Sequence, residues 1–506
     1  MSHIVAVIGS GPSGVIAARI LVAAGVNVDM YDIGTDLSYQ NQSSGSVRRA
    51  GLIPQKTLFG STYMYCRRDG MRITASDNVS FDTSHAKGGL SNVWGATVGA
   101  VTAQDISDWP VSIEELSHHL KNVFDYLQLS AREDMIDSIY PTKLSGNDLN
   151  YENIQSAFIL QEANRNAAEL LKQGIVLGKS KLAINNTPGS TNSCILCGQC
   201  MTGCERGAIF NSWTTVQTLK EQPGFRYFDR QLVHRFEERG QIVELTVSEL
   251  PNRTQRKECY RSVILAAGCI DSTKIVDASL DWTGYKYRIQ DSQKFYFPVW
   301  ISKGGSSTNN KTISLAHLYV QAFDSYGNVV QGQLYPGQLI ATTILEHLFG
   351  GFGRLIEALI KPLLNRFFVG VAYFSSSVSG QIEIQFSNDN QMTACGTANE
   401  QSNNEFKTYI SKLIKSRKLT GFVPLFRIKL KSKLGHSQHF GGTIPMKAKP
   451  VKYESDRLGR PFGCQNVFIV DSTVLTSIPA TPTTGLAMAN SARIASSVVK
   501  ILNSPL

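Results

Sequence analysis

The sequence predicts an α/β fold, α+β overall, in which a Rossmann-like nucleotide-binding domain carries an inserted domain with an antiparallel sheet and helices. Three observations predict this fold. An apolar run of strand length at residues 4–8 leads directly into a Gly-x-Gly-x-x-Gly turn and a helical stretch. A second apolar run at 26–31 ends at an acidic residue. After about residue 295, apolar and polar residues alternate as they do in an antiparallel sheet.

The glycine turn is the first element with chemical meaning. Gly9 permits the tight turn, Gly11 lets the backbone approach a pyrophosphate, and Gly14 lets the helix pack closely on the strand. The phosphates would lie at the positive end of that helix. Asp32 follows Gly14 at close to the roughly 20-residue spacing of a ribose-hydroxyl acceptor. The pattern predicts a bound dinucleotide, either NAD or FAD.

A stretch of small residues at 84–98 reads SHAKGGLSNVWGATV. Its glycine pair, Gly88 and Gly89, stands beside the polar side chains of Ser91 and Asn92. Such a stretch lets the backbone come close to something flat or anionic, and a plain tight turn is the alternative interpretation.

The middle and the end of the chain supply helices and further strands. Ser112 precedes Glu115 by three residues, a capping box that predicts the start of a helix. Residues 225–247 predict two strands around a turn at Arg239-Gly240, and 262–275 predict a strand that runs into a helix and rejoins the nucleotide-binding sheet. Residues 466–501 predict a strand, a loop rich in Pro and Thr, and a last helix.

The region predicted as antiparallel sheet contains an amphipathic segment at 354–368, with apolar residues at helical spacing and basic residues off that face. Pro362 would kink this helix or begin a second one. A helix packed on the sheet is the favoured interpretation. A basic face resting on a membrane surface is the alternative.

The composition describes a large globular protein with a basic surface. Its 506 residues, 42% hydrophobic and 18% charged, allow roughly two to four domains' worth of core. The net charge of +10 is explained by a solvated basic surface. The alternative is attraction to an anionic substrate, an acidic electron carrier or a membrane surface. No basic array with interleaved aromatics indicates nucleic-acid binding. The first strand begins at residue 4 and no apolar run reaches about 18 residues, so we expect a cytoplasmic protein.

Five segments, taken in order, resemble the glucose-methanol-choline oxidoreductases, a family of FAD-dependent enzymes that oxidise alcohols and sugars. They read GSGPSG with Asp32, AKGGLSNVWGA, VILAAGCIDS, LGHSQHFGGT and NVFIVDSTVLTSIPATPTTGLAMANSARIA, and together they span nearly the whole chain. The resemblance implies FAD as the cofactor. Some relatives link the flavin through a histidine at a position that is Val93 here, so noncovalent FAD is expected.

The resemblance also implies which residues surround the FAD. The pyrophosphate is expected at Gly9, Gly11, Ser13 and Gly14, and the adenosine ribose at Asp32. The flavin is expected beside Gly88, Gly89, Ser91 and Asn92, and the adenine beside Val233, Ala267 and Gly268. Asp471 and Thr483 are expected near the pyrophosphate, ribitol or flavin ring.

The general base of the family is the histidine of a His-x-x-Gly-Thr pattern, which matches His439 here. Hydride transfer from a carbinol carbon requires removal of the hydroxyl proton, and imidazole titrates in a suitable range. The position that carries the catalytic partner of this histidine differs from the family pattern. Relatives have His or Asn directly before the Pro of the last loop, whereas Thr481 precedes Pro482 here. A threonine hydroxyl can hydrogen-bond a substrate oxygen but cannot act as the base. His436 could compensate for this departure, although an ordinary loop histidine is the favoured interpretation.

Four of the nine cysteines, Cys194, Cys197, Cys200 and Cys204, give the C-x2-C-x2-C-x3-C spacing of ferredoxin cluster ligands. Glu205 stands where ferredoxins carry Pro, and no second such run exists. The dehydrogenase-like branch of the resembled family has a related segment, associated in some members with a cluster that takes electrons from FAD. An iron–sulfur cluster is the favoured interpretation, ahead of structural zinc, free thiols or disulfides.

The predicted organisation is discontinuous. The FAD-binding domain is expected to combine residues 1–110, 216–290 and 455–506. A helical insertion with the cysteine-rich loop is expected at 111–215, and the substrate-binding domain at 291–454.

The predicted function is oxidation of an alcohol or sugar hydroxyl, with a glycan or lipid-linked substrate included. Electrons would leave through the cluster to a carrier protein, which favours a dehydrogenase over an oxidase. One alternative is a flavin-dependent reductase or isomerase that receives electrons through the cluster. The other is a flavin-binding protein in peripheral contact with a membrane.

Overall fold

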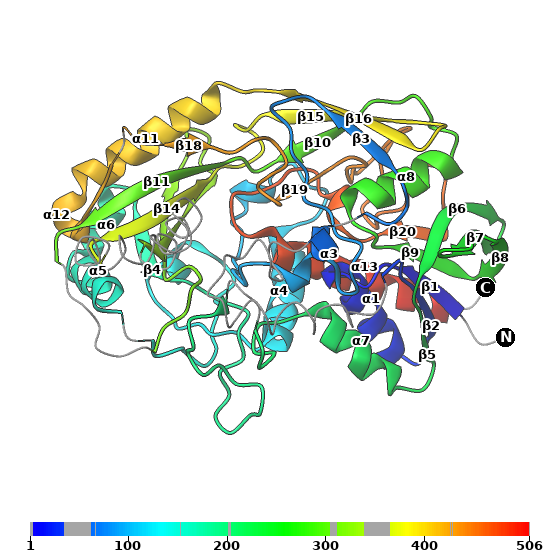
Figure 1. Ribbon diagram of the computed structural model, residues 1–506, viewed down its shortest axis with the longest axis horizontal. Helices are drawn as coiled ribbons and strands as arrows, with labels where there is room; N and C mark the ends of the chain where they lie inside the picture. Colours follow the sequence, from blue (N-terminus) through cyan, green and yellow to red (C-terminus); the bar gives the residue numbers. More distant parts are fainter. Residues whose placement is uncertain are drawn as a thin grey trace.

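The computed structural model describes residues 4–34, 62–65, 67–151, 153–200, 204–303, 311–337, 365–425, 427 and 429–504. Two regions lie side by side along its longest axis (Figure 1). One holds the parallel strands near the start of the chain, together with α13. The other holds long antiparallel strands covered by α11.

The parallel sheet is formed by five short strands of the described chain. Their order is β20 (Val467–Ile469), β9 (Ser262–Leu265), β1 (Ile4–Ile8), β2 (Asn27–Tyr31) and β5 (Phe225–Phe228). Side chains alternate along β1, so that Val5 and Val7 face the helices α1 (Pro12–Ala23), α7 (Ser212–Lys220) and α13 (Thr483–Asn503). Ala6 and Ile8 face the other side. Burial on both faces explains the continuous apolar runs, and the Rossmann-like prediction is confirmed.

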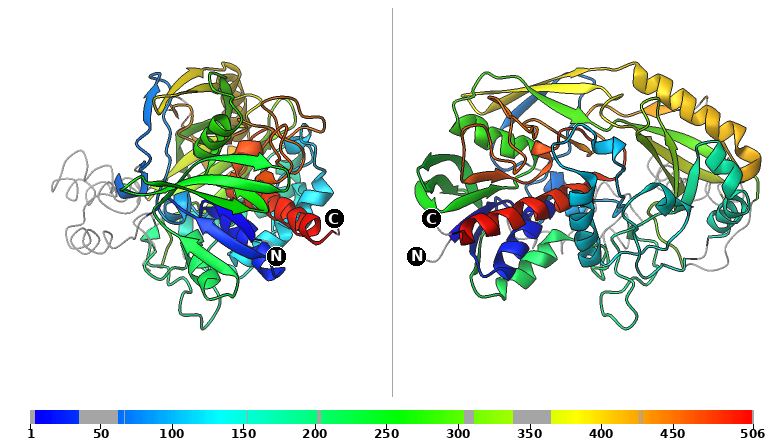
Figure 2. Two further views of the ribbon diagram at one scale, coloured as in Figure 1. Left: turned by 90° about the vertical axis from the view of Figure 1, so that its right-hand side faces the viewer. Right: turned by 180° about the vertical axis from the view of Figure 1, so that it is seen from behind.

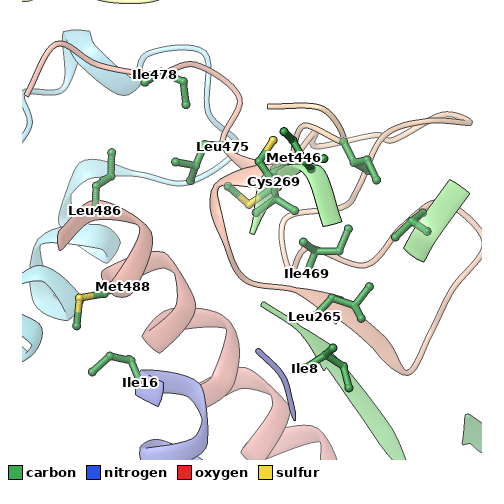
Figure 3. Close-up of a cluster of buried hydrophobic side chains, with 14 of the residues drawn as sticks. Ile8, Ile16, Leu265, Cys269, Met446, Ile469, Leu475, Ile478, Leu486 and Met488 are labelled. Carbon is green, nitrogen blue, oxygen red and sulfur yellow. The ribbon is translucent and has the colours of Figure 1, made fainter. Parts of the chain in front are cut away.

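The second face of the parallel sheet is covered by α8 (Cys269–Ser279) and by a small antiparallel sheet of β6 (Gln231–Arg239), β7 (Ile242–Glu249) and β8 (Gln255–Tyr260). Figure 3 shows how Ile8, Leu265 and Ile469 from three parallel strands gather toward Cys269 and Met446. This core fixes the ends of β1 and β9 relative to α8.

The C-terminal helix α13 ties the region together, because it packs against both α1 and α4 (Ile113–Leu127). Figure 2 shows α13 beside the first strands and helix of the chain. Ser112 is the N-cap of α4 and accepts a hydrogen bond from the Glu115 N–H (3.2 Å), so the predicted start of this helix is confirmed.

The other region is built on a sheet of seven described strands. β17 (Phe422–Pro424), β11 (Lys294–Ile301), β14 (Phe367–Tyr373), β13 (Val329–Pro336), β12 (Leu318–Phe323) and β4 (Val176–Lys179) follow in that order, and β18 (Leu430–Lys431) pairs with β11. One face is covered by α5 (Ile154–Arg165), α6 (Ala167–Lys172) and α11 (Gln401–Lys415), which is followed by α12 (Arg417–Thr420). The antiparallel sheet predicted for this part of the chain is confirmed.

A further sheet bridges the two regions. Its order is β19 (Phe440–Gly441), β10 (Tyr287–Asp291), β15 (Gln381–Ser387), β16 (Gln391–Thr397) and β3 (Arg72–Ala75). The remaining short elements are α3 (Thr62–Tyr65) and the 3₁₀ helices Gly89–Asn92, Gln104–Ile106, Met135–Ile139 and Ser472–Val474.

Two strands lie where the sequence interpretation was different. β4 falls inside the range 111–215 that we predicted as a helical insertion, yet it pairs with β12. The amphipathic segment 354–368 lies mostly outside the described residues, but Phe367 and Phe368 begin β14 and are not helical, because they pair with Trp300 and Val299 of β11. Within the described ranges, no helix combines the length and apolar character needed to cross a bilayer.

Candidate functional site

The three glycines of the first turn differ in the space around them. A Cβ on Gly9 would lie 2.4 Å from the carbonyl oxygen of Ala266, and the φ of Gly9 is +102°. A Cβ on Gly14 would lie 2.0 Å from the carbonyl oxygen of Gly9. A Cβ on Gly11 would meet nothing within 4 Å. Gly9 and Gly14 therefore allow close packing of the backbone, whereas Gly11 leaves one wall of a cavity open.

This cavity has a volume of about 710 Å³ and is the candidate nucleotide site. It runs from the glycine turn past Asp32 to β6 on one side and to Phe440 on the other. The N-terminus of α1 opens onto it, and Gly11, the N-cap, offers no side-chain acceptor to the first N–H groups. Ser13 lies in the first turn and lines the same wall. Free N–H groups at a helix N-terminus suit an anionic group such as a pyrophosphate.

Asp32 lies at the end of β2, where the sequence places it, and it lines the cavity. Its carboxylate accepts hydrogen bonds from the N–H groups of Ser10 (2.9 Å) and Gly34 (2.6 Å). Burial raises the pKa of Asp32, and these hydrogen bonds counteract part of the increase. The carboxylate thus braces the glycine turn and is also exposed to the cavity.

The segment at 84–98 packs against the glycine turn. The N–H of Gly88 donates to Ser10 Oγ (2.8 Å), and a Cβ on Gly89 would approach Gly11 Cα at 3.6 Å. Gly89 lines the cavity. Ser91 and Asn92, predicted to lie beside the flavin, direct hydrogen bonds to protein groups instead: Ser91 Oγ to the Gly88 carbonyl (2.6 Å) and Asn92 Nδ2 to the Gly89 carbonyl (2.7 Å). Their role toward a cofactor stays a prediction.

Val233, Ala267 and Gly268, which are expected on the adenine side, line the same cavity, and Ala267 lies next to Gly9 of the glycine turn. Asp471 closes the floor there, because its Oδ2 accepts hydrogen bonds from the Gly268 N–H (2.8 Å) and from Ser272 Oγ (2.6 Å). Burial raises the pKa of Asp471. This carboxylate links the end of β20 to the start of α8.

An ionic cluster that the sequence analysis missed lines the cavity beside α8. His85 Nε2 lies 3.0 Å from Asp271 Oδ2, and Arg67 forms ion pairs with both Asp271 and Asp69. Lys274 adds a second ion pair to Asp69 (2.7 Å). The cluster ties the segment that precedes the glycine pair to α8. No local pattern could reveal it, because its members come from distant parts of the chain.

His439, the predicted base, lies directly before β19 on a turn with a defined brace. The Asp291 carboxylate accepts hydrogen bonds from the Gly435 N–H (3.2 Å) and from the Ser437 hydroxyl, whose oxygen accepts from the His439 N–H (2.9 Å). Gln438 has a φ of +62° in this turn. Burial raises the pKa of Asp291 to about 6.

The imidazole of His439 stacks on the ring of Tyr373, with centroids 4.9 Å apart. Its Nδ1 is buried and has no hydrogen-bond partner among the described residues. Burial, and after it the Lys294 ammonium, lower the pKa of His439 to about 3. The ring is therefore a neutral imidazole with an unsatisfied nitrogen. The pKa of His436, in the same loop, is lowered by the same two causes.

Thr481 comes from the last loop. Its neighbour Ala480 packs with Tyr373 and Val371, so the loop reaches the aromatic ring on which His439 stacks. Thr481 is fully buried, and its Oγ1 has no hydrogen-bond partner in the described structure. Thr483 begins α13 and is buried, but it does not line the nucleotide cavity. Neither role assigned from the resemblance is tested by these contacts.

The four clustered cysteines line one small cavity of about 150 Å³. The backbone N–H groups of Leu196 and Ala208 point at the sulfurs of Cys194 (3.4 Å) and Cys204 (3.3 Å). Burial raises the pKa of Cys200 to about 11. Among the described residues, no group of three or more His, Cys, Asp or Glu side chains is arranged as metal ligands are. The loop thus brings the sulfurs around one space without the geometry of a formed metal centre.

The fold places an open cavity at the end of a parallel sheet, with an antiparallel sheet beside it. The structure is similar to that of pyridoxine 4-oxidase from Mesorbium loti, with a TM-score of 0.62 and 14% identity over 98% of this chain and 99% of that one. It is also similar to an FAD-dependent oxidoreductase from Chaetomium thermophilum, with a TM-score of 0.61 and 13% identity over 100% of both chains.

No protein-family model and no curated protein sequence matches the chain. At 14% and 13% identity, the two structural likenesses establish the fold, and the predicted α/β fold with an added antiparallel sheet is confirmed along the whole chain.

Proposed function

We propose that the protein is an FAD-dependent oxidoreductase that oxidises a CH–OH group, and that FAD occupies the cavity beside the glycine turn. The residues present fit this group. The open space at Gly11 and the uncapped start of α1 suit a pyrophosphate, and Asp32 lies where a ribose hydroxyl would need an acceptor. The volume of about 710 Å³ is in the roughly 300–1,000 Å³ range of cofactor sites. The names of the two similar structures, an oxidase and an FAD-dependent oxidoreductase, agree with this proposal.

One observation carries the catalytic part: the neutral, half-buried imidazole of His439 with an unpartnered Nδ1. A bound flavin supplies the hydride acceptor. The chain must then remove the hydroxyl proton as the C–H bond breaks, so that a carbonyl forms. A neutral imidazole can accept this proton, and burial, together with the Lys294 ammonium, keeps it unprotonated beforehand. Tyr373 stacks on the ring and the Asp291–Ser437 brace fixes its backbone, so the proton acceptor is held in one orientation.

The test is anaerobic reduction of bound flavin across a panel of alcohols and sugars, comparing the parent with His439→Asn and the matched control His436→Asn. Loss of a general base lowers rates by typically about 10²–10⁴-fold. We expect that loss in His439→Asn with FAD content unchanged, while His436→Asn keeps most of the parent's rate. Full-speed reduction in His439→Asn would remove His439 from the role of base.

The cysteine loop supports a second, finer proposal, an iron–sulfur cluster that makes the protein a dehydrogenase. Its support is the ligand spacing, the shared cavity and the two N–H groups directed at sulfur. A bound cluster would accept electrons one at a time for delivery to a carrier protein. Iron and acid-labile sulfide in protein purified without oxygen test it, with Cys259→Ser as the control for Cys200→Ser. Iron-free protein that reduces oxygen rapidly would contradict this proposal.

A further inference from the structure

A buried lysine lies beside the tyrosine ring on which His439 stacks. Lys294 begins β11 and is 8% exposed. Antiparallel pairing places it opposite Tyr373 of β14, the residue on which His439 stacks. Its Nζ lies 5.5 Å from the centre of the Tyr296 ring on the same strand. Residues paired across antiparallel strands point to the same face, so Lys294, Tyr296 and Tyr373 all project from one side of the sheet.

The Lys294 ammonium keeps its charge although burial by itself lowers its pKa. The oxygens of Tyr373 and Tyr296 and the Asp82 carboxylate outweigh burial, and the pKa of Lys294 is raised above its usual value. Lys294 hydrogen-bonds the Tyr296 side chain, and within the described ranges no carboxylate forms an ion pair with its ammonium. Asp82 instead accepts a hydrogen bond from Gln438 (2.9 Å). The ammonium is thus charged and buried but is not paired with a carboxylate, and an anionic ligand would supply that ion pair.

The same sheet face offers further unused polar atoms. Gln333 is paired with Val371, and its Oε1 accepts a hydrogen bond from the Tyr335 hydroxyl (2.7 Å). Its Nε2 is buried and has no partner among the described residues. Ala480 of the last loop packs against this face, and the Oγ1 of its neighbour Thr481 is buried with no partner among the described residues. Buried polar groups are nearly always hydrogen-bonded, so these atoms together indicate a place for an oxygen-rich ligand.

The geometry points to a substrate that is an acidic alcohol, whose carboxylate or phosphate group binds Lys294 while its hydroxyl faces His439. This inference rests on the proposed function and names its substrate class. Lys294 is a binding residue here, not the base. Charge-assisted hydrogen bonds to a buried ammonium are among the stronger single contacts that a site can make. The aromatic and amide groups of the sheet face would contact the rest of the molecule.

The test measures ligand binding to the holoprotein from the rise in its thermal midpoint with ligand concentration, a readout that needs no turnover. The probes are two matched pairs, gluconate with glucitol and glucose 6-phosphate with glucose. We expect at least one anion to bind about 10- to 100-fold more tightly than its neutral partner. Which pair shows the preference tells whether the acidic group is a carboxylate or a phosphate.

Four variants distinguish a direct contact between Lys294 and the acidic group from a general effect of the protein's positive charge. Lys294→Met and Lys294→Gln are expected to lose the preference, Lys294→Arg to keep it, and Lys433→Met, at an exposed lysine of the neighbouring loop, to leave it unchanged. Equal binding of anions and neutral partners, absence of any anion binding, or a preference that survives in a folded Lys294→Gln would overturn the inference. A protein that oxidises neutral alcohols and ignores the charge at position 294 would overturn this inference alone, and the proposed function would stand.

Discussion

Alanine substitutions at Gly11 and Gly14 are expected to have opposite effects on the apoprotein. Gly11 has φ −66° and ψ 177°, a conformation open to alanine, and its added Cβ meets no protein atom within 4 Å. Alanine has fewer accessible conformations than glycine in the unfolded chain, so the free energy of unfolding of Gly11→Ala should be higher than the parent's by about 0.4–1 kcal/mol. In Gly14→Ala, a helix-propensity gain of about 1 kcal/mol competes with a Cβ placed 2.0 Å from the Gly9 carbonyl oxygen. Overpacking against backbone costs about 1–3 kcal/mol or more, so Gly14→Ala is destabilised.

Binding of FAD separates the two variants further. The Gly11→Ala methyl group projects into the space proposed for the pyrophosphate, and an overpacking cost of about 1–3 kcal/mol corresponds to roughly 5- to 150-fold weaker binding. The assays are thermal melting of the apoprotein by circular dichroism and titration of FAD by quenching of its fluorescence. Gly11→Ala should melt at or above the parent's midpoint and bind FAD weakly. FAD binding at the parent's affinity would mean that the pyrophosphate does not lie at Gly11.

Two further predictions concern titrating groups near the candidate base. Because the pKa of His439 is lowered to about 3, the rate constant for flavin reduction should stay level from about pH 5 to pH 8. A rate constant that falls toward low pH with a midpoint near pH 6.5 would contradict a neutral His439. The pKa of Asp291 is raised to about 6, so between about pH 4 and pH 6 its carboxyl is protonated in the folded protein but ionised in the unfolded chain. The stabilisation that the protonated carboxyl gives the fold is therefore present at about pH 4 and is lost as the pH rises through 6. Asp291→Asn should therefore show a flatter thermal midpoint against pH than the parent over this window, and equal slopes would refute the assignment.

Local sequence was sufficient to predict the strand, the glycine turn and the helix that form one wall of the cavity. A strand, a glycine turn and a helix follow one another within a short stretch, so the spacing alone assigns separate roles to Gly9, Gly11 and Gly14. Asp32 ends its strand, and the end of a parallel strand faces the ligand side of such a sheet. The segments of the last loop and of β19 were found by resemblance and not by periodicity.

The surroundings of His439 could not be predicted, because they depend on the register between distant strands. Lys294 meets Tyr373 only through pairing of β11 with β14, and Asp291 reaches the His439 turn only through pairing of β10 with β19. One signal was present: a lysine at the head of the otherwise apolar and aromatic run of β11. In an alternating strand, such a residue is either at an edge or functional.

The pairing of β3 with β16 and of β4 with β12 was missed for the same reason. Short strands carry little periodicity, and their partners lie far away in sequence. The ionic cluster of Arg67, His85 and Asp271 combines residues that are likewise unremarkable in their own segments.

The most direct test of a flavin site in this cavity is the absorption spectrum of the purified protein, followed by release of its chromophore with acid. We expect flavin bands in the folded protein, and release of FAD in a ratio of one per chain with no flavin left attached to the polypeptide. A colourless protein that takes up no FAD when the cofactor is added would contradict the central claim that the cavity beside Gly11 and Asp32 is a flavin site.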